Sequence, residues 1–494
     1  MGYRVSTERM NEILTALSDR YQVYGPRWDA QKKRVQYAQV RNVGQIVYDR
    51  QSDFSPKAAF YPVSQVMFSF REDGVEEQVP ADERGILIFA RACDLNAIRR
   101  QDALFLKNGG AEDLFYKRMR ERVKFVLMEC AESFENCFCA SLGTNVAEEY
   151  AMAVRFGADD LLVQVKDAAF ADLFAAEEEA EFTVRFIEEN RKKLRIPDIR
   201  RENLKEISDL PFWSKFDDQC IGCGGCNTVC GTCTCFDTVD VVYTEGGREG
   251  ERRRVWSGCM LEDFTETAGG VRARKTRGAN MRFKVFHKFY DYQVRFGEQM
   301  CVGCGRCDIR CPKEISFFDT VCELHDEIEE HGLAAHADSS CVDAAAGMDV
   351  IANRDPAASN GNIMKPEPHR ILKIVQETKA EFTFRVEFSE PGAFGQFCML
   401  SVPKVGEAPI SISGTGDGWV EFTIRKVGRL TDGVFELREG SMLYLRGPYG
   451  HPWPVEEFEG PDQHLVVISG GTGLAPVRTT LNHFYQHPEQ IQSL

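Results

Sequence analysis

Two runs of cysteines constrain this chain more than any other feature of its sequence. The first run extends from Cys220 to Cys230 and the second from Cys301 to Cys311, and both have the spacing C-x2-C-x2-C-x3-C. This spacing is typical of a loop that wraps its thiolates around a four-iron cubane cluster. In two-cluster ferredoxins the fourth cysteine of each run binds the cluster of the other run. The expected ligand sets are therefore Cys220, Cys223, Cys226 and Cys311 for cluster I, and Cys301, Cys304, Cys307 and Cys230 for cluster II.

Structural zinc is the alternative for these cysteines, because C-x2-C also begins many zinc ribbons. A zinc ribbon needs two separated pairs of ligands around one tetrahedral ion. Here each run packs its four cysteines into eleven residues and leaves no second pair at ribbon distance. This density favours two [4Fe-4S] clusters. Gly231 stands where such a run usually continues with proline, and this difference removes no ligand.

A third group of cysteines follows two short apolar stretches in the N-terminal part. Residues 85–93 and 124–130 are predicted to be buried strands of a parallel sheet, and they end at Cys93 and Cys130. Ligands collect at the carboxyl ends of parallel strands, and a polar loop then leads to Cys137 and Cys139. These four thiols are a candidate third cluster, with a spacing that matches no standard ferredoxin run. The alternative is that they are small core side chains.

The composition limits the partners and the compartment. The chain has 494 residues, 43% of them hydrophobic, and a formal net charge of −16. An acidic chain is a poor match for nonspecific nucleic-acid binding, which requires a basic face. No apolar run is long enough to span a membrane, and the N-terminus lacks the apolar segment of a signal peptide. Clustered thiols without such a signal predict a protein of the reducing cytoplasm.

Basic residues gather between the two cluster runs. They are expected to form a solvated surface that also offsets the negative clusters, and docking of a redox partner is the alternative. The residues concerned are Arg252 to Arg254, Arg272, Arg274, Lys275, Arg277, Arg282, Lys284 and Lys288.

Several motifs in residues 1–340 together resemble a known family. They are Arg91-Ala-Cys93-Asp94, Cys137-Phe-Cys139, the two cluster runs, and Trp256-Ser-Gly-Cys259 with Gly269-Gly270. This combination resembles the A-type iron–sulfur subunit of anaerobic sulfite reductases, and the β subunits of sulfhydrogenases share the pattern. The resemblance implies a subunit that transfers electrons, separate from the catalytic one that binds sulfite.

A different kind of domain follows a linker at residues 341–365, which is rich in small and turn-forming residues. Six short β-rich runs with glycine-rich turns then predict a closed antiparallel barrel. The runs are residues 371–375, 382–388, 396–402, 408–413, 419–427 and 442–446.

Four motifs in the predicted barrel look like the FAD barrel of ferredoxin-reductase-type proteins. They are Gly395-Gln-Phe397, Pro409-Ile-Ser411, Gly428-Arg-Leu-Thr431 and Arg446-Gly-Pro-Tyr-Gly450. The nearest members are the B-type subunit of anaerobic sulfite reductase and the electron-transfer subunit of dihydroorotate dehydrogenase. The resemblance implies that backbone amides and hydroxyls hold FAD at Pro409, Ile410, Ser411, Gly428 and Thr431. The usual motif has arginine where this chain has Ala408, which weakens the expected FAD site.

Residues 461–494 have the pattern of the start of an NAD-binding domain. The stretch from His464 to Pro476 predicts a strand, a glycine turn and a helix start, which together present backbone amides to dinucleotide phosphates. About 24 residues follow Gly470, too few for the several βα units of such a domain. We therefore expect a truncated domain, or one completed by another chain, that binds NADH weakly or not at all. The candidate NAD contacts are Gly470, Gly471, Thr472, Gly473 and Pro476.

The sequence thus predicts a multidomain α/β and α+β protein. The expected parts are an α/β domain at 1–205, a ferredoxin-like domain at 206–340, the linker, the barrel at 366–460 and an incomplete Rossmann-like segment at 461–494. Residues 8–21 and 185–200 are expected to be helical.

The predicted function is a relay from NADH through FAD and [4Fe-4S] clusters, and the resemblance implies that the acceptor is a separate sirohaem subunit that reduces sulfite to sulfide. One alternative is the corresponding role in a nickel–iron sulfhydrogenase. A non-enzymatic ferredoxin-like carrier or scaffold is the other. No sirohaem ligand set is found in this sequence.

Overall fold

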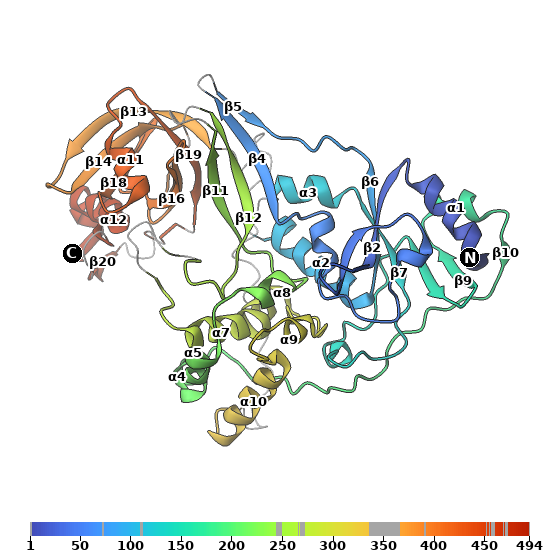
Figure 1. The fold of residues 1–494 in the computed structure, drawn as a ribbon. Helices are drawn as coiled ribbons and strands as arrows, with labels where there is room; N and C mark the ends of the chain where they lie inside the picture. Colours follow the sequence, from blue (N-terminus) through green and yellow to red (C-terminus); the bar gives the residue numbers. More distant parts are fainter. Residues whose placement is uncertain are drawn as a thin grey trace.

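The computed structural model divides into an α/β part with a mixed sheet, a helical cluster part and an antiparallel barrel (Figure 1). The predicted linker lies outside the residues that the structure describes. In the described part of the chain, no helix is long and apolar enough to cross a membrane. The described residues are 2–71, 74–108, 112–243, 249–264, 266, 272–334, 366–389, 392–450, 452–453, 455, 460–467, 469 and 473–493.

The N-terminal part is built on an eight-stranded sheet with the order β10-β1-β9-β8-β7-β6-β2-β3. Strands β2, β6, β7 and β8 are parallel neighbours, as expected for the two predicted strands that became β6 and β7. The strands are β1 (Gly2–Ser6), β2 (Tyr21–Asp29), β3 (Arg34–Gln39), β6 (Gly85–Ala90), β7 (Val123–Met128), β8 (Met152–Phe156), β9 (Asp160–Val165) and β10 (Glu178–Glu179).

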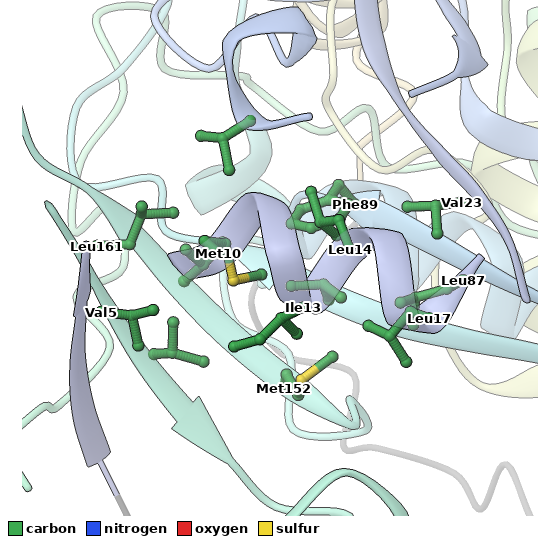
Figure 2. Packing of buried hydrophobic residues seen from close by; sticks show 14 of the residues in the cluster. Val5, Met10, Ile13, Leu14, Leu17, Val23, Leu87, Phe89, Met152 and Leu161 are labelled. Atoms are coloured by element: carbon green, nitrogen blue, oxygen red, sulfur yellow. The ribbon is translucent and has the colours of Figure 1, made fainter. Parts of the chain in front are cut away.

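Helix α1 (Thr7–Leu17) covers one face of this sheet and buries its apolar stripe there (Figure 2). Met10, Ile13, Leu14 and Leu17 recur at the spacing of one helix face, and they pack against strand residues such as Phe89. The helix ends earlier than the predicted residue 21, because Tyr21 already begins β2. Helices α2 (Ala92–Leu106) and α3 (Leu114–Arg120) belong to the same part.

A second sheet joins the N-terminal part to the cluster part. Its order is β11-β12-β4-β5 and all its pairings are antiparallel. Strands β4 (Ser64–Arg71) and β5 (Gly74–Glu77) come from the first part, whereas the hairpin β11 (Phe236–Val242) and β12 (Gly250–Trp256) comes from between the cluster runs. The boundary at residue 205 stays a prediction, and strands from both sides of it share this sheet.

The cluster part is mostly helical and has its own core, which includes Trp213, Phe216, Val285, Phe289 and Leu324. A π-helix at His287–Asp291 interrupts the long helix in its middle. The helices are α4 (Leu204–Asp209), α5 (Lys215–Gln219), α6 (Gly225–Thr228), α7 (Arg277–Phe286), α8 (Tyr292–Phe296), α9 (Arg306–Ile309) and α10 (Phe317–Glu330). Short 3-10 helices elsewhere in the chain lie at Val43–Gln45, Pro56–Ala59, Cys139–Leu142, Ala168–Phe174, Pro211–Ser214 and Pro488–Gln490.

The prediction of a helix at residues 185–200 is wrong, since this stretch has no helical residue. Two of its residues bond to the loop that carries Cys139 and to Asn145 just after it. The Asn190 side chain accepts from the backbone N–H of Ala140 at 2.7 Å, and the carbonyl of Ile187 accepts from Asn145 at 2.6 Å. These contacts hold the stretch extended between the first part and the cluster part.

The barrel follows the predicted six strands closely and adds a short seventh. Its sheet order is β16-β15-β19-β13-β14-β18-β17, and β16 also contacts β18, so that the sheet curls round a core. The elements are β13 (Glu367–Gln376), β14 (Glu381–Glu387), β15 (Phe397–Val402), β16 (Gly406–Ser411), β17 (Gly414–Gly416), β18 (Trp419–Arg425), α11 (Arg429–Phe435) and β19 (Met442–Tyr449).

The chain continues with a βαβ unit of β20 (Gly460–His464), α12 (Leu474–Gln486) and β21 (Ile491–Ser493). The two strands are parallel. The predicted strand and helix are thus present, with the strand placed a few residues earlier than expected.

Candidate iron–sulfur and flavin sites

The two cysteine runs adopt the same local structure. Each run passes through two glycines with positive φ and then forms a four-residue helix, α6 or α9. In the second run, Gly303 and Gly305 have φ of 60° and 69° and lie against the loop that carries Cys137 and Cys139. A Cβ on Gly303 would lie 2.6 Å from the carbonyl carbon of Phe138. The second run therefore packs directly on the third group of cysteines.

The four cysteines expected at cluster I line one cavity. Cys220, Cys223 and Cys226 come from the first run and Cys311 comes from the second, so the crossed set meets in space. Cys307 of the cluster II set also borders this cavity. Among the cysteines that the structure describes, Cys223 is exposed, whereas the other members of the set are half-buried.

The cysteines expected at cluster II lie deeper. Burial raises the pKa of Cys301 to about 12, and Cys230 is among the groups that act on it electrostatically. A hydrogen bond with the Cys233 thiol, and then Lys288, lowers the pKa of Cys230 well below its ordinary value. The Lys288 Nζ lies 3.5 Å from the Cys230 Sγ. Because only thiolates bind metal, loading these buried positions must release protons.

The candidate third group also comes together. Cys93, Cys130 and Cys139 belong to one cluster of side chains with Cys304 of the second run. The Cys137 Sγ lies 4.0 Å from the Cys304 carbonyl oxygen. Burial raises the pKa of Cys137 to about 12 and that of Cys139 to about 11. The arrangement has four thiols at the carboxyl edge of β6 and β7, beside the loop of cluster II.

In the described residues, no three or more His, Cys, Asp or Glu side chains lie close enough to share one metal ion. A cubane binds each thiolate through a different iron, so its ligands lie farther apart than those of a single ion. The absence of a single-ion site is therefore compatible with cubane clusters held by these grouped cysteines.

An ion pair that the sequence did not reveal fixes the second run against α2. Arg306, which lies between Cys304 and Cys307, is buried and contacts the Asp94 carboxylate at 2.5 Å. The Tyr37 hydroxyl donates to the same carboxylate at 3.2 Å. Asp94 in the Arg91-Ala-Cys93-Asp94 motif was the one sign of this ion pair in the sequence, because an acidic side chain directly after a buried strand needs a partner.

The expectation of a solvated basic surface is wrong for four of the residues between the runs. Arg252, Arg254, Lys284 and Lys288 are each at most 3% exposed. The two arginines are buried because each meets a carboxylate, Asp240 for Arg252 and Asp113 for Arg254, both at 2.7 Å. The two lysines instead face the cluster cysteines. Arg272 and Arg277 do lie nearer the surface, in ion pairs with Glu262.

The residues expected at FAD lie along one strand and one helix start. Pro409, Ile410 and Ser411 are on β16, and Gly428 precedes α11. The Thr431 hydroxyl is used locally, since it accepts from the amides of Val427 and Gly428, both at 2.9 Å.

In the described chain, the hydroxyl of Ser411 has no hydrogen bond, so it stays available to a ligand. Ala408 packs in the barrel core and supplies no charge. The hydroxyl of Ser411 is therefore a polar group that a flavin could use, the amides of Val427 and Gly428 are already taken by Thr431, and the usual arginine is missing.

The expected NAD turn is only partly described. Gly473 precedes α12 and Pro476 lies in its first turn. Gly470, Gly471 and Thr472 lie outside the described residues, as do Gly269 and Gly270 of the family pattern.

These features define an iron–sulfur protein in which a two-cluster domain is joined to an antiparallel barrel. Residues 219–315 match the family model described as a 4Fe-4S dicluster domain. The chain belongs to the family of the sulfhydrogenase β subunits. It is 30% identical to sulfhydrogenase 2 subunit β of Pyrococcus furiosus over 339 residues, which cover 98% of that protein and 65% of this chain.

Shorter matches connect the chain to two other kinds of subunit. It is 41% identical over 119 residues to sulfhydrogenase 1 subunit γ of Pyrococcus furiosus, covering 22% of this chain and 40% of that one. It is 35% identical over 116 residues to a probable dihydroorotate dehydrogenase B (NAD(+)) electron transfer subunit of Methanopyrus kandleri, covering 23% and 42%. The chain thus spans about two fifths of the length of these relatives.

Proposed function

We propose that this chain is the electron-transfer component of an NADH-dependent anaerobic sulfite reductase. It would pass electrons through FAD and [4Fe-4S] clusters to a separate sirohaem subunit that reduces sulfite to sulfide. The observation that carries the relay is the meeting of Cys220, Cys223 and Cys226 with Cys311 around one cavity, within a matched 4Fe-4S dicluster domain. Motifs that resemble the A-type iron–sulfur subunit of sulfite reductases support sulfite as the acceptor.

The barrel would supply the entry point of the relay. FAD, when bound, accepts two electrons as a hydride and releases them singly, which suits clusters that carry one electron each. Ser411 and the backbone amides at the start of α11 would hold its pyrophosphate. The relative named as an NAD(+)-linked electron transfer subunit supports this assignment. The chain spans only part of that relative, and in the proposal NADH is therefore oxidised with a nucleotide domain that is more complete than the βαβ unit described above.

The β11–β12 hairpin supports a direct connection between the barrel and the clusters. At one end it contacts β16, the strand that ends in Ser411. At the other end it lies between Cys235 and Ser257, whose backbones are joined by a hydrogen bond of 3.0 Å. Ser257 lines a second cavity together with Cys223 of the cluster I set. This hairpin would hold the flavin strand at a fixed distance from the clusters.

The exposure of Cys223 supports an exit for electrons beside cluster I. A protein partner can approach cluster I most closely through an exposed ligand, and Ile221 beside it is 55% exposed. In the proposal, the acceptor protein therefore docks at this edge of the molecule. The opposite neighbour of cluster II is the third group of cysteines, Cys93, Cys130, Cys137 and Cys139.

A third cluster at that group is part of the proposal. Its support is the meeting of Cys93, Cys130 and Cys139 in one buried group, with Cys137 near Cys304. Iron analysis of the purified chain tests it, because three cubanes require about twelve irons and two require about eight. A value near eight would contradict the third cluster while leaving the relay in place.

The corresponding role in a nickel–iron sulfhydrogenase is the second candidate function. The specific observation that favours it is membership of the sulfhydrogenase β-subunit family over 98% of the relative's length. A carrier or scaffold with a flavin-free barrel is the third candidate, and the visible spectrum of bound flavin in the purified chain would argue against it.

Anaerobic affinity purification of the full chain from its own cells tests the acceptor. Metal, flavin and sirohaem are then measured in the recovered complex. The proposal expects a sirohaem protein in about equal amount with this chain. If the complex instead holds the large subunit of a hydrogenase, the sulfite reductase assignment is contradicted and the second candidate is favoured.

A further inference from the structure

Three lysines of this chain are almost completely buried. Lys57, Lys284 and Lys288 are 2%, 2% and 3% exposed. Buried lysines are rare unless a carboxylate accompanies them. In the described part of the chain, however, no carboxylate forms an ion pair with any of the three. Their charge must be balanced by something else.

The neighbours of Lys284 and Lys288 are cluster cysteines. Lys288 places its Nζ 3.5 Å from the Sγ of Cys230, a member of the cluster II set. Its Nζ also donates to the Thr232 hydroxyl at 2.9 Å. The side chain is therefore held at a fixed place beside the cluster II set.

Lys284 lies between the two cluster sets. Cys226 of the cluster I set and Cys307 of the cluster II set line the same cavity as Lys284. Its ammonium lies over the Phe317 ring at 4.6 Å, and the side chain borders the cavity of cluster I.

The helix geometry places both lysines on the same side. Lys284 is in α7 and Lys288 follows four residues later, inside the π-helix at His287–Asp291. Residues four apart lie on one face of a helix, and wide π turns often occur at functional positions. Phe289, inside the same wide turn, lies in the core of the cluster part.

We propose that Lys284 and Lys288 set the reduction potentials of the clusters, an inference that rests on the iron–sulfur part of the proposed function. A reduced cluster carries one more negative charge than an oxidised one. A positive charge nearby stabilises the reduced form, and little water is present to screen it. Lys288 acts mainly on cluster II, whereas Lys284 acts on both clusters.

Redox titration of the full, cluster-loaded chain, followed by electron paramagnetic resonance, tests this role without NADH or a partner. Lys288→Met is expected to lower the ratio of reduced to oxidised cluster II at least tenfold at a fixed potential. For a one-electron couple this is a downward shift of about 59 mV. Lys284→Met is expected to lower the potentials of both clusters, and Lys288→Arg, which keeps the charge, is expected to restore most of the shift.

Lys313→Met is the matched control, because Lys313 also borders the cavity of cluster I but is exposed. Its loss is expected to leave both potentials nearly unchanged. Unchanged potentials in Lys288→Met with full iron content would overturn the inference. If Lys288→Met loses iron, the potentials of Lys284→Met are measured instead, and unchanged potentials there would overturn the inference. Loss of iron in both variants would show that the lysines have a structural role, and that result would overturn the inference as well. A parent chain without iron would instead contradict the proposed function.

Discussion

Removal of the Arg252 side chain is expected to separate the barrel from the rest of the chain. Arg252 bonds to Asp240 within its own hairpin at 2.7 Å and to Glu407 of the barrel at 2.7 Å. It also donates to the Ser401 hydroxyl at 2.7 Å. Arg446 completes the network through a 2.7 Å contact with Glu407. The side chains of Asp240, Arg252 and Glu407 are 1%, 4% and 2% exposed.

The magnitude follows from the charge balance of this network. Two acids meet two arginines, so Arg252→Met leaves one buried carboxylate without a partner. Breaking a buried pair in this way costs about 3–5 kcal/mol. Each 1.4 kcal/mol changes an equilibrium constant about tenfold, so the ratio of docked to undocked barrel would fall roughly 100-fold to 4,000-fold. The barrel itself should stay folded, because it has a separate core.

Hydrogen exchange and flavin-to-cluster electron transfer measure the effect together. Arg252→Met is expected to increase exchange at the β11–β12 hairpin and at β16, and to slow electron transfer at unchanged iron content. Arg253→Met is the matched control, because its side chain is 39% exposed and pairs with Glu251, a type of pair that contributes less than about 1 kcal/mol. Equal exchange and equal transfer rates in the two variants would refute the argument.

Four further predictions address other parts of the account. Cys304→Ala should remove or convert one cubane and leave the other, and a full set of cluster signals in the reduced variant would contradict the ligand assignment. Gly305→Ala should destabilise the second run by about 2 kcal/mol or more, because Gly305 has a φ of 69° and Asn136 occupies the space that a Cβ would need. Gly332→Ala is the control, since Gly332 has a φ of 65° and no atom near the position of a Cβ. In urea unfolding this control should cost only about 1 kcal/mol. The pKa of Glu377 is lowered by its hydrogen bonds with Thr383 and then Arg478. The docking of α12 that Glu377 supports should therefore be fully present above the pKa of an unfolded glutamate, about 4.3, and should be lost as the pH falls through the lower pKa of the folded protein. Glu377→Gln should therefore raise hydrogen exchange in α12 at pH 7, and unchanged exchange would be the contrary result. NADH at micromolar concentration should not bleach the flavin rapidly in stopped-flow mixing, and rapid bleaching would show that the βαβ unit suffices.

The spacing of the cysteine runs was enough to predict which parts of the chain meet, because ligand geometry is local and repeated. The barrel strands were predictable for a similar reason, since period-two runs and glycine turns define them. The crossing of the runs came from a rule about two-cluster proteins. It stays a prediction, because Cys307 borders the cavity of cluster I as well as Cys311.

Contacts between distant segments could not be predicted. Nothing around Arg252 indicates that Glu407, 155 residues later, accepts its charge, and for that reason a buried network looked like a solvated surface. The stretch 185–200 has helical composition, yet Ile187 and Asn190 bond to Asn145 and Ala140 around the Cys139 loop. In both cases contacts with distant parts of the chain determined the structure, and the local sequence does not show which distant residues will be in contact.

An anaerobic reductive titration of the purified full chain tests the central claim most directly. Dithionite is added in known amounts while flavin absorbance and cluster signals are recorded. The account predicts at least four electrons per chain, two for FAD and one for each of two cubanes, with electrons moving between flavin and clusters. Zinc in place of iron, or a flavin whose electrons never reach the clusters, would contradict it.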